Sequence, residues 1–199
     1  KLEVKEDQSS EWSEVISETK NSISSVNVIN NSFVVIYLED TLSLVNFYNL
    51  DGSFSHKLKG DFKGSIGGFG GSIDDTETYF SFTNFTTPSQ IHKIDLTKNS
   101  SKLFWAQNLK DFNAIDYVSE LRFYKSKDGT RIPLHISYKK TTKLNSSSPV
   151  LLYGYGGFNI SILPRFSKSY LAWMNQGGVV AVANLRGGGE YGGAWHNDG

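Results

Sequence analysis

The chain has 199 residues, enough for one full domain or for parts of two larger ones. Its 20 Lys and Arg balance its 20 Asp and Glu, and this zero formal charge argues against nucleic-acid or membrane-surface binding, which needs a basic excess. The sequence contains no cysteine, which excludes disulfides, a cysteine nucleophile and thiolate metal sites. We therefore expect a cytoplasmic protein with no nucleic-acid and no membrane partner.

Residues 10–105 read as short strands separated by turns. Ser32–Glu39 and Leu42–Tyr48 are rich in β-branched and aromatic residues, which favours strands. Thr78–Phe85 and Ser89–Asp95 superimpose on this pair at an offset of about 45 residues. A repeat of roughly 40–50 residues with about four strands is typical of β-propeller blades. Two unrelated antiparallel meanders are the alternative interpretation.

The pattern changes near Ala114. Ser119–Lys125 and Arg131–Tyr138 alternate apolar and polar residues, and the Asp-Gly turn between them predicts a hairpin. After a polar loop, Pro149–Tyr153 has the continuous apolar character of a buried strand.

A helix and a second apolar strand are predicted next. Ser167 to Asn175 reads as a helix that Ser167 caps and Gly177 ends. Gly178–Asn184 follows as a fully apolar strand. A strand, a helix and a strand with continuous apolar runs predict a parallel α/β sheet that is buried on both faces. The chain therefore holds the end of one domain and the start of another.

The glycine-rich run Tyr153–Phe158 lies where a predicted buried strand ends and the chain turns towards a helix. Glycines in such a loop let the backbone approach a reacting carbonyl closely, and a tyrosine hydroxyl is a suitable donor to a developing oxyanion. A plain strand-to-helix turn that uses glycine for its backbone freedom is an equally good interpretation.

A second glycine-rich run, Gly187–Gly192, matches the G-x-G-x-x-G pattern after a strand. A dinucleotide site also needs a helix that opens within the motif and an acidic residue about 20 positions later. The segment up to His196 is a poor helix start, so we favour a structural loop and expect no NAD or other cofactor.

Neither a metal site nor a serine nucleophile can be assigned in the sequence. The four histidines are scattered without metal-ligand spacing and are predicted to be structural: His56, His92, His135 and His196. No Gly-x-Ser-x-Gly sequence occurs, so no serine can be placed on a nucleophile elbow.

Two long motifs occur in a fixed order, Leu152–Ile162 and then Gly177–Gly192 with Trp195-His196. With Ser126–Pro133 upstream, they resemble the prolyl oligopeptidase family, and the likeness spans nearly the whole chain. The resemblance implies a mixed fold in which the last two blades of a seven-bladed β-propeller precede the start of an α/β-hydrolase domain. We expect residues 1–113 to form the blades and residues 114–199 to form the first part of the peptidase domain.

The resemblance also implies an activity, which is hydrolysis of short peptides after proline by a serine endopeptidase through an acyl-enzyme. Tyr155 matches the family's oxyanion-stabilising hydroxyl, and Phe158 matches an aromatic wall of the pocket for proline. The family's catalytic Ser, Asp and His have no matching positions here, so we expect an internal fragment, inactive alone, of a longer monomeric enzyme. The alternative is a non-catalytic binding module that carries a relic hydrolase domain.

Overall fold

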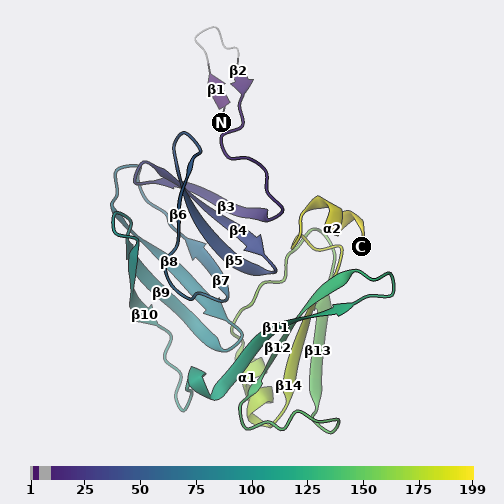
Figure 1. Cartoon of the computed structure of the whole chain (residues 1–199). Coiled ribbons are helices and arrows are strands. Elements are labelled where there is room, and N and C mark those ends of the chain that lie inside the picture. The colour runs from purple at the N-terminus through teal and green to yellow at the C-terminus, as the bar shows by residue number, and fades with distance from the viewer. Residues whose placement is uncertain (1, 5–9) are drawn as a thin grey trace.

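A computed structural model describes residues 2–4 and 10–199 of the chain, which are mostly β structure (Figure 1). The strands are β1 (Leu2–Val4), β2 (Ser10–Trp12), β3 (Ser22–Ile29), β4 (Ser32–Glu39), β5 (Leu42–Asn49), β6 (Phe54–Lys57), β7 (Ser65–Gly68), β8 (Glu77–Asn84), β9 (Thr87–Asp95), β10 (Ser100–Ala106), β11 (Tyr117–Lys125), β12 (Arg131–Lys139), β13 (Val150–Tyr155) and β14 (Val179–Asn184). The helices are α1 (Lys168–Asn175), α2 (Gly193–Asn197) and a 3₁₀ turn at Ala114–Asp116. In the described residues, no helix is both long enough and apolar enough to cross a membrane.

Apart from the antiparallel pair β1-β2, two four-stranded antiparallel sheets form the first half of the molecule (Figure 1). Their strand orders are β3-β4-β5-β6 and β10-β9-β8-β7, so each is a simple meander. The offset of about 45 residues that the sequence predicts is confirmed, because β8 and β9 occupy the same places in the second sheet as β4 and β5 do in the first.

The two sheets bury one apolar core between them. Phe69 stacks on Phe80 with ring centroids 5.1 Å apart, and Phe47 meets Phe69 edge-on at 6.1 Å. Such aromatic pairs stabilise a core beyond their buried area. The buried members of this core are Ile29, Val34, Ile36, Val45, Phe47, Phe69, Phe80, Ile94 and Leu96.

A third sheet is mixed, with the order β11-β12-β14-β13 (Figure 1). As predicted, β13 and β14 are parallel and α1 connects them. Met174 on α1 is buried against β14, and Gly177 ends the helix with a φ of +86°. Ser167 precedes the helix, but its side chain makes no capping hydrogen bond.

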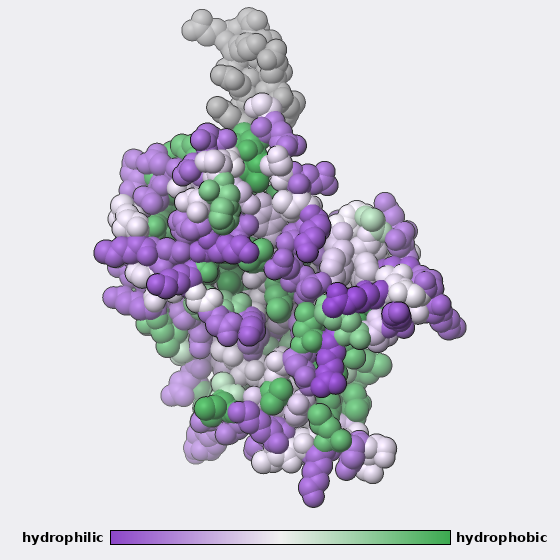
Figure 2. Space-filling model, viewed as in Figure 1, coloured by the Kyte–Doolittle hydropathy of each residue, from purple (hydrophilic) through white to green (hydrophobic). Residues whose placement is uncertain are grey.

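The prediction that this sheet is buried on both faces is right for β14 and wrong for β13. All six residues of β14 are buried, whereas Val150, Leu151, Leu152 and Tyr153 in β13 are 39–68% exposed. The reason is that β13 lies at the edge of the sheet and pairs, among the described residues, only with β14. Hydrophobic residues accordingly reach the surface in the lower part of the molecule, where the mixed sheet lies (Figure 2).

Side chains of the first two sheets reach directly into the mixed-sheet half. Phe85, after β8, is buried in the same cluster as Met174. The turn between β4 and β5 supplies two further contacts. Asp40 accepts a hydrogen bond from the Tyr191 hydroxyl at 2.8 Å, and the fully buried Thr41 hydroxyl meets Nε2 of His135 at 2.7 Å. The two halves of the chain therefore share polar contacts at one junction, of which the Thr41–His135 contact is buried.

His135 should make this junction sensitive to acid. Burial lowers the pKa of His135 from 6.5 to about 4, since a charged imidazole is poorly solvated there. The part of the folding stability that requires a neutral His135 is fully present above pH 6.5. It is lost as the pH falls towards 4, and the loss amounts to roughly 3 kcal/mol in total. We expect thermal unfolding of the wild-type protein to show this loss and His135→Gln, which keeps a polar contact to Thr41, to show less of it. Identical pH profiles for the two proteins would contradict this assignment.

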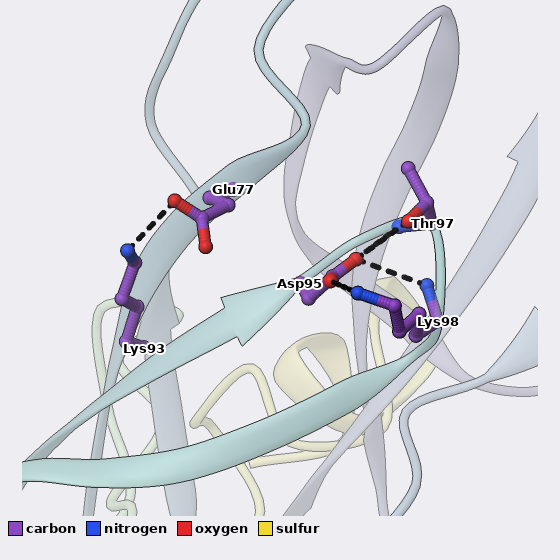
Figure 3. Close-up of polar contacts among 5 residues, drawn as sticks. All are labelled: Glu77, Lys93, Asp95, Thr97 and Lys98. Atoms are coloured by element: carbon purple, nitrogen blue, oxygen red, sulfur yellow. Dashed lines mark hydrogen bonds and ion pairs between the residues drawn. The ribbon is translucent and has the colours of Figure 1, made fainter.

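The turn between β9 and β10 is held by a carboxylate (Figure 3). Oδ1 of Asp95 accepts hydrogen bonds from the backbone N–H and the hydroxyl of Thr97 at 3.0 and 2.6 Å, and Oδ2 pairs with Lys98 at 2.6 Å. The nearby ion pair of Lys93 with Glu77 joins β9 to β8 at 2.7 Å. Asp95 thus closes the hairpin in the way that Asx turns do.

Replacing Asp95 should remove an acid-labile part of the stability. The Lys98 and Thr97 contacts lower the pKa of Asp95 from 3.8 to about 2. Because the folded pKa lies below the unfolded one, this stabilisation is present above pH 3.8 and is lost as the pH falls through about 2. We expect Asp95→Asn to lower the melting temperature slightly at pH 7 and to change it little at pH 2. An equal drop at both pH values would show that the carboxylate charge is not responsible.

Candidate functional site

The candidate site lies where the two parallel strands end. Tyr155, the last residue of β13, is the register partner of Asn184, the last residue of β14, so their side chains share one face of the sheet. The backbone N–H of Leu185 donates to the Tyr155 carbonyl at 3.3 Å and continues the pairing past β14. In open α/β sheets, ligands bind at this carboxyl edge of parallel strands.

The turn that follows β13 begins at Gly156, two residues later than the glycine pattern predicts. A Cβ atom on Gly156 would lie 2.2 Å from the Arg186 carbonyl oxygen, so this glycine is required by the chain's own backbone. A Cβ on Gly157 would meet no atom within 4 Å. Of these two positions, only Gly157 therefore leaves open space for a substrate. The sequence led us to expect that the glycines of this loop in general make room for a reacting carbonyl.

The next two residues have a strained backbone. Phe158 and Asn159 have φ values of +54° and +56°, a region that a bulky residue rarely adopts. The turn is closed by a hydrogen bond from Ile160 N–H to the Gly157 carbonyl at 3.1 Å, and Asn159 N–H donates to the Gly187 carbonyl at 3.1 Å. The Phe158 side chain is 86% exposed. An exposed aromatic ring on a strained loop is a common feature of binding sites.

The end of this loop is tied to a buried carboxylate. Glu190, which is fully buried, accepts hydrogen bonds at Oε1 from Ile162 N–H at 2.9 Å and from Nδ2 of Asn184 at 3.0 Å. Nδ2 of Asn184 also donates to the Ile162 carbonyl at 2.6 Å. Sequence reasoning missed both side chains as functional candidates. The signal was available, since each is a polar residue in or beside an otherwise apolar or glycine-only run.

The second glycine run packs against the first. Gly187 has a φ of +93°, and a Cβ atom there would lie 2.8 Å from the Gly156 carbonyl oxygen. The prediction of a poor helix start is wrong in one respect, because the short helix α2 begins at Gly193. Helix α2 begins after the glycine run and not within it, as a dinucleotide site would need. The Glu190 side chain fills the space beside Gly188. Both observations favour the interpretation of this run as a structural loop over a nucleotide site.

A cavity of about 580 Å³ opens beside the site, between the mixed sheet and the second blade-like sheet. The aromatic side chains of Tyr153, Tyr170 and Phe85 line this cavity, and Ile160 lines it from the loop that follows β13. Tyr155, at the end of β13, and Phe158, in the loop after it, are not among the residues that line this cavity. The two predicted site residues are therefore close in the chain but lie outside the cavity.

Each histidine contacts other groups of the protein. His56 and His92 stack on Phe47 and Phe80, His135 contacts Thr41, and Nδ1 of His196 lies 2.8 Å from the Gly187 carbonyl. In residues 2–4 and 10–199, no group of three His, Cys, Asp or Glu side chains is arranged to hold a metal ion.

The arrangement can supply hydrogen-bond donors to a negatively charged oxygen. Tyr155, the last residue of β13, carries a hydroxyl at this edge, and the glycine loop follows it directly. Comparisons with known proteins identify the family of the chain. Residues 1–107 match the prolyl oligopeptidase N-terminal β-propeller domain, and residues 164–199 match the prolyl oligopeptidase family. The chain belongs to the prolyl oligopeptidase family.

Members of the prolyl oligopeptidase family resemble this chain over nearly its whole length. This chain is 43% identical over 188 residues to a prolyl endopeptidase of Elizabethkingia meningoseptica, and the match covers 94% of the chain and 26% of that protein. A prolyl endopeptidase of Dictyostelium discoideum is 34% identical, with coverages of 95% and 25%. The chain thus spans about a quarter of the length of these curated relatives.

Solved structures of the prolyl oligopeptidase family agree with this fold. A prolyl endopeptidase structure superimposes with a TM-score of 0.85 and 40% identity, over 92% of this chain and 27% of the other. Prolyl oligopeptidase B from Galerina marginata, bound to a 25mer macrocyclization substrate, gives a TM-score of 0.88 and 30% identity, over 98% of this chain and 27% of the other. The match to the propeller family and the β-rich structure confirm the propeller part of the predicted fold.

Proposed function

We propose that this chain is part of a serine endopeptidase that hydrolyses short peptides on the carboxyl side of proline. The observation that carries the proposal is the position of Tyr155 at the carboxyl end of β13, on a glycine loop that is anchored by the neighbouring strand end. A hydroxyl held in that place can donate to the oxyanion that develops when a peptide carbonyl is attacked.

The domain assignment is part of the same proposal. Residues 1–113 are the last two of seven propeller blades, and residues 114–199 begin the α/β-hydrolase domain. Support comes from the two meanders with equivalent strands and from the order β11-β12-β14-β13, in which an antiparallel hairpin leads into parallel strands. The exposed apolar edge β13 is where a further parallel strand of such a domain would pair.

The mechanism divides the work between this chain and the rest of the enzyme. A serine of the whole protein attacks the carbonyl carbon of the substrate proline, and a histidine held by an aspartate takes the serine proton and later gives it to the leaving amine of the next residue. Tyr155 and a backbone N–H stabilise the oxyanion in both the acylation and deacylation steps. The ring of Phe158 packs against the substrate proline, and its 86% exposure leaves it accessible for that contact.

The proposal is tested with matched substrates on the whole protein. We expect cleavage of benzyloxycarbonyl-Gly-Pro p-nitroanilide, little cleavage of the Gly-Ala analogue, and loss of activity after treatment with a serine-directed organophosphate. A protein that cleaves neither substrate would support the non-catalytic binding module instead. A monomeric state, a cytoplasmic location and the absence of a cofactor stay predictions.

A further inference from the structure

Glu190 is a buried carboxylate that the proposed peptidase mechanism does not use. It lies in the second glycine run, while its hydrogen bonds lead to the loop of the first run through Ile162. We propose that Glu190 is a positioning residue, which sets the catalytic geometry of Tyr155 and Phe158 by holding the loop between them and Ile162. This inference rests on the proposed function for its kinetic consequence.

The contacts form a closed set around one peptide unit. Oε1 of Glu190 accepts from Ile162 N–H at 2.9 Å, and Asn184 bridges Glu190 Oε1 and the Ile162 carbonyl at 3.0 and 2.6 Å. Glu190 in the second glycine run therefore accepts from the N–H of Ile162, and Asn184 at the end of β14 donates to its carbonyl, so both backbone polar groups of Ile162 have a side-chain partner. Buried polar groups satisfied in this way rigidify the segment that carries them.

The loop is held at three points. Its start is fixed where Leu185 N–H donates to the Tyr155 carbonyl, and its middle where Asn159 N–H donates to the Gly187 carbonyl. Glu190 and Asn184 hold the end. Between these points, Phe158 and Asn159 have positive φ values, and such a strained backbone persists only where its surroundings enforce it. Removing the end point should let the loop relax and displace the groups it carries.

The reach of the Glu190 side chain matters more than its charge. Both of its hydrogen bonds end on Oε1, while Oε2 and Oδ1 of Asn184 are buried without a partner among the described residues. A glutamine keeps the Oε1 acceptor at the same distance from the backbone and replaces the unpartnered Oε2 by an N–H donor. A methionine has a similar length but lacks the oxygen acceptor. The pair Glu190→Gln and Glu190→Met therefore separates the hydrogen bonds from the packing.

The first measurement is hydrogen exchange in the whole protein, which is independent of activity. In Glu190→Met, we expect amide exchange across residues 156–162 to become about tenfold faster or more, because this local opening loses its hydrogen bonds. Glu190→Gln should exchange as the wild type does, and Glu77→Met on the surface of β8 serves as a control for loss of a carboxylate. Unchanged exchange in Glu190→Met would overturn the proposal.

The second measurement is a double-mutant cycle with Tyr155→Phe. Glu190→Met should lower kcat roughly 10- to 100-fold through the displaced Tyr155, since a small misplacement of a catalytic group has an effect of this size, and should raise KM for the proline substrate through the displaced Phe158. Its effect on kcat should almost vanish when Tyr155 is already Phe, because both changes remove the same transition-state contact, whereas its effect on KM should remain. Fully additive effects on kcat would overturn the positioning role. If Glu190→Met does not fold, Glu190→Asp, which shortens the side chain by one methylene, replaces it in both measurements.

The outcomes also separate this inference from the proposed function. A wild-type protein without peptidase activity, or a Tyr155→Phe variant with full activity, contradicts the proposed function and leaves the exchange measurement to decide whether Glu190 holds the loop. Faster exchange together with unchanged kcat in an active protein overturns the inference alone.

Discussion

Replacing Tyr155 by phenylalanine in the whole protein is expected to lower kcat by about 10²–10³-fold, which is the cost of removing one oxyanion donor in comparable sites. A phenol donor strengthens as its acceptor becomes negatively charged, so its benefit falls on the transition state. The ring and its packing are kept in this variant, and KM for a proline substrate should change little.

Tyr153 provides a matched control for this experiment. It lies two residues earlier on the same face of β13 and lines the neighbouring cavity. Tyr153→Phe also removes one hydroxyl from this strand, and we expect its kcat to stay within about twofold of the wild-type value, because no oxyanion contact is lost. Equal losses in the two variants would mean that the strand tolerates neither change and that Tyr155 has no special role.

The second large effect is expected at Phe80 in the core between the two meanders. Phe80 is 1% exposed and packs against Phe69, Phe62 and His92. Phe80→Ala should lower the free energy of unfolding by about 3–5 kcal/mol, since close-packed aromatic neighbours cannot collapse fully into the space that is left. Denaturant unfolding of the whole protein measures this change.

The adjacent Tyr79 is the control for that substitution, because its side chain is 44% exposed on the opposite face of β8. Tyr79→Ala removes an aromatic ring of similar size and should destabilise the protein much less than Phe80→Ala. Similar losses from both substitutions would contradict the view that the core between the sheets holds the two meanders together.

Much of this fold follows from local sequence patterns. The strands β4, β5 and β8 have strong β-branched and aromatic runs, and the spacing of these strands and β9 predicted the repeat. The short outer strands were harder to predict. Residues of β7, Ser65–Gly68, are half glycine and form a strand because β8 pairs with them and not because of their own preference.

The errors of the sequence analysis concern tertiary surroundings. An apolar run such as Val150–Tyr153 predicts a buried strand, but burial depends on which strand lies on each side, and β13 lies at an edge. The glycine-rich run marks Glu190 as an unusual charged residue, but it does not show which group the carboxylate contacts. Its carboxylate acts on Ile162, 28 residues earlier in the chain. Long-range pairs of this kind appear only when the fold brings the two glycine motifs together.

The most direct test of the account measures inhibition of the whole protein by a peptide aldehyde that ends in prolinal. A serine nucleophile converts the aldehyde into a tetrahedral adduct whose oxygen resembles the reaction's oxyanion, whereas the corresponding alcohol, which forms no adduct, reports ground-state binding only. If Tyr155 stabilises the oxyanion, Tyr155→Phe should weaken the aldehyde by about 10²-fold or more and leave the alcohol unchanged. Equal weakening of both inhibitors, or of neither, would contradict the central claim.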